Sequence, residues 1–193
     1  MKSNRRRFIQ QVSLGAGAVL TNGNTHAQVL NEGNARKEKQ GPRFNMCGYA
    51  APKLDVVRVG IIGLGMRGSG AVERLSYIEG VEITAICDKY PDQVSRSQQT
   101  LARMGRPKAK EYTGENGWKA LCESNDVDLV YTPTPWELHA PIALYAMKNG
   151  KHAATEVNAA LSVDQAWELV ETSESTRKHC MMLENCCYDF FEL

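Results

Sequence analysis

The sequence predicts an α/β fold built on a doubly wound parallel sheet, and two observations support this prediction. Short apolar runs rich in β-branched residues, such as Val57–Ile62 and Val81–Cys87, have the length and composition of buried parallel strands. Segments of helical period separate these runs, so strand and helix alternate along the chain. No run is apolar over enough residues to span a bilayer.

Each element is expected from local patterning and from residues that start or stop it. The expected strands are 57–62, 81–88, 110–113, 127–131, 152–156 and 180–184. The first helix follows a glycine loop and should bury Ala71, Val72, Leu75 and Ile78. The later helices are expected at 91–103, with Pro91 in the first turn, at 118–123, at 138–149 before Gly150, and from the Ser162 cap to 177.

The loop after the first strand has the pattern G-x-G-x-x-G and predicts a dinucleotide site. Gly63 allows the tight turn, Gly65 lets a pyrophosphate approach the backbone, and Gly68 lets helix and strand pack closely. Asp88 follows Gly68 by twenty residues at the end of the second strand, where it can bind the adenosine ribose hydroxyls. The alternative is a structural glycine turn. Strand, loop, helix and acid agree with each other, so the sequence favours a Rossmann domain over residues 55–185.

The same acid favours NAD over NADP, because a carboxylate at Asp88 would repel a 2′-phosphate. The neighbouring Lys89 could soften that preference.

Residues 1–27 have the features of an export leader. The run Asn4–Gln10 resembles a twin-arginine signal, a weakly apolar segment Val12–Leu20 follows, and small residues end it near Ala27. The alternative is a basic amphipathic helix or arm. Export would place the chain in the periplasm or outside the cell, with the twin-arginine translocase as a partner. Because that route carries folded proteins, we expect a tightly held NAD that is bound before export.

Composition places few further limits on function. The chain has 193 residues and a formal charge of +1. Without its basic leader it has 19 basic and 22 acidic residues, a net charge of −3, so nucleic acid is not an expected partner.

Residues 28–54 are polar and predict a linker. The six cysteines lack metal-binding spacing, and Cys87, Cys122 and Cys180 fall in predicted elements as small apolar residues, so no metal or disulfide is expected.

Ligands of a doubly wound sheet collect beyond the carboxyl ends of its strands. Three such ends carry polar residues, namely Thr134–His139 after the fourth strand, Glu156 after the fifth and Asn185 after the sixth. A helix-starting histidine and a solvated glutamate are the alternatives for His139 and Glu156. Their shared edge with the glycine loop favours cofactor or substrate contact.

These residues carry a family resemblance. The glycine loop, Asp88, the T-P-x-x-x-H of Thr134–His139 and Gly150–Glu156 resemble the Gfo/Idh/MocA oxidoreductases. Within that group, four segments resemble glycoside hydrolase family 109, the NAD-dependent α-N-acetylgalactosaminidases: 136–139, 145–148, 155–157 and 181–193. The resemblance implies cofactor contacts at Met66, Arg67, Asp88, Trp136, Glu137, Leu138, His139, Glu156, Val157 and Asn185. Where ordinary members carry Glu-Lys-Pro, this chain has Glu156-Val157-Asn158; the missing lysine fits the hydrolase branch and the missing proline fits neither.

The resemblance also implies a mechanism. Hydride leaves C3 of the sugar for NAD, a base removes the C2 proton, the aglycone is eliminated, water adds and the hydride returns, as an exception to the paired-carboxylate route. Tyr188 is the candidate base, and an aromatic residue that packs between domains is its alternative.

Family members are more than twice this long and carry a second, α+β substrate domain. Residues 186–193 would be the start of that domain, so we expect NAD binding without hydrolysis, and self-association through uncovered apolar surface. Three hypotheses stay open: a glycosidase that binds an N-acetylgalactosaminide, a sugar oxidoreductase, and a non-catalytic NAD-binding fragment.

Overall fold

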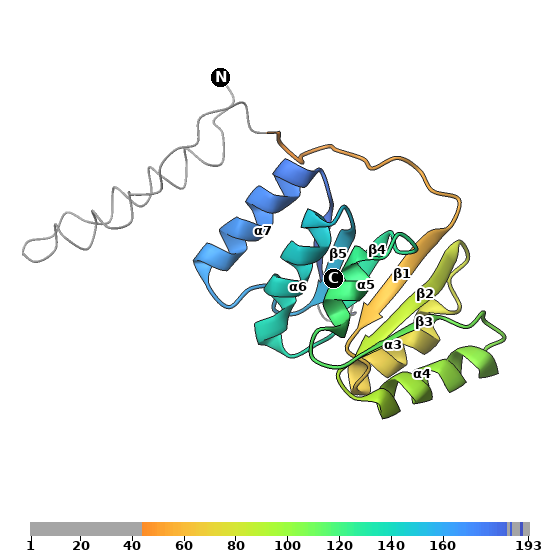
Figure 1. Cartoon of the computed structure of the whole chain (residues 1–193). Coiled ribbons are helices and arrows are strands. Elements are labelled where there is room, and N and C mark those ends of the chain that lie inside the picture. The colour runs from red at the N-terminus through yellow and green to blue at the C-terminus, as the bar shows by residue number, and fades with distance from the viewer. Residues whose placement is uncertain (1–43, 185, 187–189, 191–193) are drawn as a thin grey trace, which may run out of the picture. The chain divides into compact units, whose positions relative to one another are not determined.

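The computed structural model describes residues 44–184, 186 and 190, which contain one six-stranded parallel sheet (Figure 1). The strand order is β3-β2-β1-β4-β5-β6, which confirms the doubly wound prediction. The strands are β1 (Val57–Ile62), β2 (Val81–Asp88), β3 (Lys110–Thr113), β4 (Leu129–Thr132), β5 (His152–Glu156) and β6 (Cys180–Leu183). The order reverses between β1 and β4, so the two strands that flank the expected ligand crevice are neighbours.

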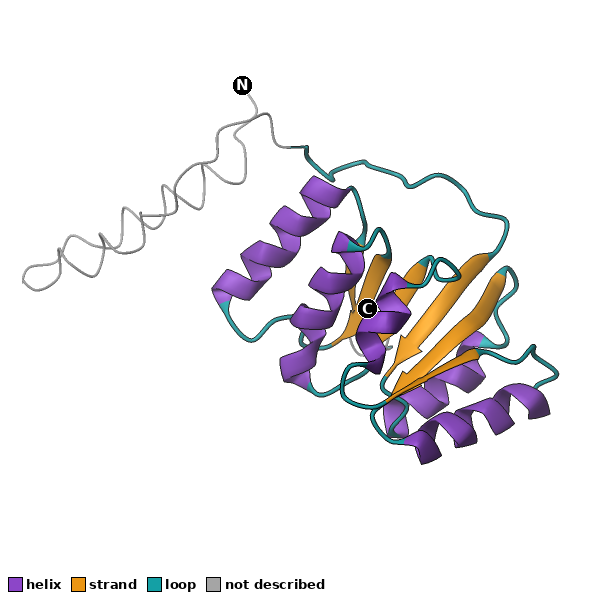
Figure 2. Cartoon of the chain, in the orientation of Figure 1, coloured by secondary structure: helices purple, strands orange, loops and turns teal. Residues whose placement is uncertain are grey.

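Helices lie on both faces of the sheet (Figure 2). On one face are α3 (Met66–Leu75) and α4 (Pro91–Arg103), and on the other are α5 (Gly117–Glu123), α6 (Trp136–Lys148) and α7 (Val163–Thr176). One core lies under α3 and α4 around Ile61 and Val72, and the other lies under α5 and α6 around Leu121 and Ile142. None of the described helices is long and apolar enough to cross a membrane.

Three local expectations were wrong. Ile78 lies outside α3 and is 48% exposed, because the chain leaves the helix after Leu75 through tight i to i+3 backbone bonds. Helix α6 begins at Trp136, two residues before the expected start, directly after its N-cap Pro135, which has no backbone N–H to donate. Strand β4 begins at Leu129 instead of Val127.

The buried cysteines behave as expected from the sequence. Cys87 and Cys122 are buried in the core, where burial raises the pKa of each thiol to about 12. All described cysteines are free, and Cys180 is half-buried. Between residues 44 and 184, no group of three or more histidine, cysteine, aspartate or glutamate side chains is arranged to hold a metal ion.

The described part of the expected linker, residues 44–54, has no helix or strand but lies against the domain. The Tyr49 ring is 5.3 Å from that of His179, and the Arg177 guanidinium is 4.7 Å from the Phe44 ring centre. The expected leader at 1–27 lies outside the described residues and stays a prediction, as do the structural roles expected for Asn185 and Tyr188.

Candidate functional site

The glycine loop gives each of its three glycines a different environment. Gly63 has a φ of +95°, which only glycine adopts without strain, and it turns the chain out of β1. A Cβ on Gly68 would lie 1.8 Å from the Gly63 carbonyl oxygen, so helix and loop touch there. A Cβ on Gly65 would meet no atom within 4 Å, so the space above this residue is open. This is the division of roles that a dinucleotide loop requires.

The start of α3 is suited to an anion. Gly65 is the N-cap, and no side chain caps the helix. The first backbone N–H groups of an α-helix have no partner within it, and the helix dipole favours negative charge at this end. A diphosphate would therefore find donors and open space at the same place, and the residues present fit that group.

Asp88 faces the glycine loop across the sheet edge. Its Oδ2 accepts a hydrogen bond of 2.6 Å from the Leu64 backbone N–H, and its Oδ1 accepts one of 2.9 Å from that of Tyr90. These bonds fix the carboxylate where β2 ends, beside the loop. The position agrees with the ribose-binding role expected for Asp88, which stays a prediction.

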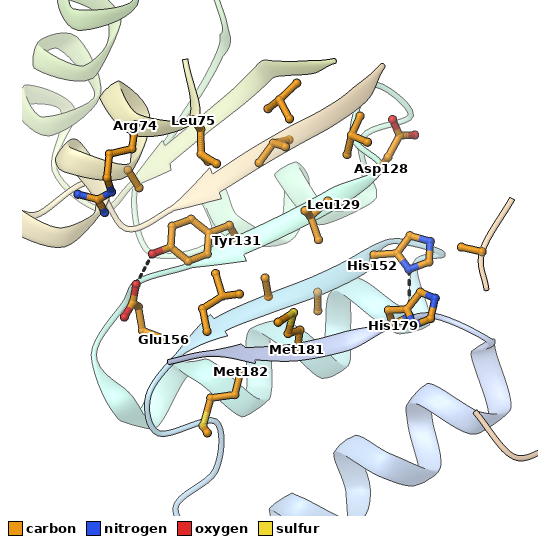
Figure 3. Close-up of a pocket in the computed structure, with 18 of the residues that line it drawn as sticks. Arg74, Leu75, Asp128, Leu129, Tyr131, His152, Glu156, His179, Met181 and Met182 are labelled. Carbon is orange, nitrogen blue, oxygen red and sulfur yellow. Dashed lines mark hydrogen bonds between the residues drawn. The ribbon is translucent and has the colours of Figure 1, made fainter. Parts of the chain in front are cut away.

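Glu156, Arg67 and Tyr131 form a cluster at the carboxyl end of the central strands. Glu156 Oε1 accepts a hydrogen bond from the Tyr131 hydroxyl (Figure 3). Glu156 Oε2 lies 3.3 Å from an Arg67 guanidinium nitrogen. Burial, together with this bond to a carboxylate, raises the pKa of Tyr131. The cluster therefore connects the glycine loop, through Arg67, to β4 and β5.

Tyr131 was not among the residues expected at the site. A tyrosine in a buried strand needs a partner for its hydroxyl, and this is the signal in the sequence that could have identified it.

His139 lies inside the domain instead of facing the crevice. It is 1% exposed, and its two ring nitrogens each lie 2.8 Å from a backbone carbonyl oxygen, that of Asn158 and that of Thr134. The ring therefore joins the loop after β4 to the loop after β5. The cofactor contact expected for His139 stays a prediction.

The other expected contacts of this region lie around the start of α6 and the end of β5. Trp136, Glu137 and Leu138 are exposed in the first turn of α6. Val157 follows Glu156 directly, and its peptide bond to Asn158 is cis. The structure thus brings most of the expected contacts to one edge of the sheet, whereas Asn185 and Tyr188 lie outside the described residues.

An apolar groove of about 970 Å³ opens beside this edge (Figure 3). It runs over β1, β4, β5 and β6 on the face that carries α3, and its floor includes Leu129, Tyr131 and Met181. At its other end the His179 backbone N–H donates to His152 Nδ1 at 2.9 Å. Burial lowers the pKa of His152, and the nearby Lys178 and His179 lower it further.

Comparison with known proteins agrees with this geometry. Residues 57–184 match the model of an oxidoreductase family with an NAD-binding Rossmann fold. The chain is 49% identical over 188 residues to a glycosyl hydrolase family 109 protein of Porphyromonas gingivalis, an alignment that covers 94% of this chain and 39% of the relative. It is 56% identical over 150 residues to glycosyl hydrolase family 109 protein 1 of Bacteroides fragilis, covering 77% of this chain and 32% of the relative.

Two solved structures have the same fold. KijD10, a 3-ketoreductase from Actinomadura kijaniata solved with NADP and TDP-benzene, is 29% identical with a TM-score of 0.57, and the match covers 66% of this chain and 37% of that one. An NAD-binding protein from Listeria innocua is 23% identical with a TM-score of 0.58, over 69% and 36% of the two chains. The chain thus spans about a third of the length of the proteins that it matches.

Proposed function

The chain belongs to the oxidoreductase family with an NAD-binding Rossmann fold, and we infer its function from this membership. We propose that the nucleotide lies across the start of α3, with its diphosphate over Gly65 and its adenosine ribose on Asp88. Its nicotinamide end would then lie toward Glu156 and the first turn of α6. When bound, NAD supplies a reversible acceptor for hydride.

The observation that carries this proposal is the open space at Gly65 beside an uncapped helix start. The chain places there open space above Gly65, the backbone N–H groups of a helix start that no side chain caps, and a fixed carboxylate. The ion pair between Arg67 and Glu156 also supports this position, because it joins the glycine loop to the end of β5 in the other half of the sheet.

We further propose that the domain is the nucleotide-binding half of an NAD-dependent glycosidase that acts on terminal α-N-acetylgalactosamine. The support is the 49% to 57% identity to proteins named glycosyl hydrolase family 109. The exposed Trp136 and Leu138, at the same edge as Glu156, give an apolar surface against which a sugar ring can pack. C3 oxidation followed by elimination, hydration and reduction is the reaction that this proposal implies, with Tyr188 as its candidate base.

A sugar oxidoreductase is the second candidate, favoured by the match to a 3-ketoreductase. The two candidates differ in their products. A glycosidase of this type releases the aglycone without accumulating NADH, whereas an oxidoreductase accumulates NADH from a free sugar.

The test of nucleotide binding compares two glycine substitutions in the same segment. We expect Gly65→Ala to fold normally and to weaken NAD binding at least about tenfold, because the new methyl group fills the space above the loop. Gly70→Ala is the matched control, since its Cβ would meet only the flexible end of Arg74, and it should bind NAD like the parent chain. Titration calorimetry gives both dissociation constants, and circular dichroism checks the fold.

Unchanged NAD affinity in Gly65→Ala would overturn the proposed nucleotide position. The same preparations test the rest of the proposal. The parent chain should keep its NAD through dialysis, and the 193 residues alone should release no aglycone from a chromogenic α-N-acetylgalactosaminide. Release of aglycone by this chain would show that no further domain is needed, and NADH formation from a free sugar would favour the oxidoreductase.

A further inference from the structure

We propose that Glu115 is a specificity-determining residue, which makes the site select NAD over NADP by engaging Lys89. This inference rests on the proposed nucleotide site and adds to it a residue from outside the glycine loop and β2. A cation near the ribose is what accommodates the 2′-phosphate of NADP, and Lys89 directly follows the ribose-binding candidate Asp88.

The backbone holds Glu115 close to this position. Asp88 pairs with Thr113 in the register of β2 and β3. The chain after Thr113 stays beside β2, since the Gly114 backbone N–H donates to the Lys89 carbonyl oxygen at 3.3 Å. Glu115 is the next residue, so its side chain begins beside Lys89 in any rotamer.

The side chains then meet. Lys89 Nζ lies 2.6 Å from Glu115 Oε1, and this carboxylate raises the pKa of Lys89. The lysine therefore stays charged, but its charge is already balanced by a carboxylate. A 2′-phosphate would have to compete with Glu115 for this lysine, and it would approach two carboxylates, those of Asp88 and Glu115.

Asp88 cannot relieve this repulsion by turning away. Both of its oxygens accept backbone hydrogen bonds, from Leu64 and from Tyr90. Both members of the ion pair are more than half exposed, at 53% for Lys89 and 73% for Glu115, so water screens their interaction. The expected effect on affinity is accordingly moderate.

The test is a double-substitution cycle in the full chain, with the dissociation constants for NAD and for NADP measured by calorimetry. We expect Glu115→Gln to tighten NADP binding about fivefold while NAD binding changes less than about twofold, because Lys89 is released to bind the phosphate. When Lys89→Ala is also present, Glu115→Gln should give a clearly smaller gain. Glu111→Gln is the matched control, because it removes the same charge from a β3 residue paired with Lys108, and it should leave both constants unchanged.

Three outcomes would overturn the proposal. In the first, Glu115→Gln leaves NADP affinity unchanged or changes both nucleotides alike. In the second, the NADP gain is equally large with and without Lys89. In the third, no variant binds NAD at all, and the nucleotide site fails together with this inference; NAD binding by the parent chain separates that result from the first two.

Discussion

His139 shows at the scale of one residue how a site motif can act through the fold. Its ring nitrogens lie 2.8 Å from the carbonyl oxygens of Thr134 and Asn158, and the side chain is 1% exposed. Thr134 belongs to the loop before α6, and Asn158 to the loop after β5. A side chain that joins these two loops stabilises the fold, and it also fixes the positions of both loops at the edge where a ligand would bind.

We expect His139→Ala to lower the free energy of unfolding by about 2 to 4 kcal/mol, because it leaves a cavity and removes the ring N–H donor that lies between two carbonyl oxygens. Denaturant unfolding followed by circular dichroism measures the change. Glu137→Ala, two residues earlier on the exposed face of α6, is the control and should change stability by less than about 0.5 kcal/mol. A stable His139→Ala chain that has lost NAD binding would instead indicate direct contact with the nucleotide.

At the scale of elements, the strands were predicted best. The bounds of β1, β2, β3 and β5 match the predicted ranges. For β1 and β2 the reason is that apolar, β-branched runs between turn residues have few alternatives. The helix ends were predicted less well. Ile78 continues the helical period of α3, yet the turn after Leu75 directs it outward, which a periodicity argument cannot detect.

The part of the site that depends on local backbone conformation, the glycine loop, was predictable from the sequence. The roles of Gly63, Gly65 and Gly68 follow from the spacing alone. The Tyr131–Glu156 and Lys89–Glu115 pairs were not predictable, because each joins residues 25 or more positions apart that only the strand register brings together.

A charged pair, Arg58 and Asp128, joins β1 to the residue before β4. Two guanidinium nitrogens of Arg58 donate to the two Asp128 oxygens, at 2.9 and 2.6 Å, and the Arg58 backbone N–H adds a bond of 3.0 Å. The hydrogen bonds and charge of Arg58 hold the pKa of Asp128 below its usual range. The pair therefore stabilises the fold while Asp128 is ionised, above the carboxyl pKa of the unfolded chain.

Asp128→Asn should lower stability by about 1 kcal/mol at neutral pH, since it removes the charge but keeps the shape. As the pH falls below the unfolded carboxyl value of about 4, the parent chain loses this contribution progressively through the lower folded pKa, so the two stability curves should converge. Urea unfolding at a series of pH values measures both curves. Asp55→Asn, at an exposed position before β1, should run parallel to the parent; a constant gap for Asp128→Asn would rule out the charge as its cause.

At the scale of the whole described domain, the two edges of the sheet differ. β3 is short and carries Lys110 and Glu111, which protect an edge strand from pairing with another chain. β6 carries Met181 and Met182, exposed by 55% and 46%. The apolar groove lies beside β6, and no described helix covers β4, β5 and β6 on that face. Among residues 44–184, the domain therefore exposes an apolar surface beside β6, the last strand at that edge of the sheet.

We expect the 193 residues alone to self-associate through this surface, because burying apolar area and pairing an open edge both favour association. Light scattering behind a sizing column should show a mean mass that rises with protein concentration. Met181→Glu places a charge on the groove and should shift the chain toward monomer, whereas Tyr77→Glu changes an exposed aromatic residue outside the groove and should leave the association as it is. A concentration-independent monomer, or equal effects of the two substitutions, would show that this face does not drive association.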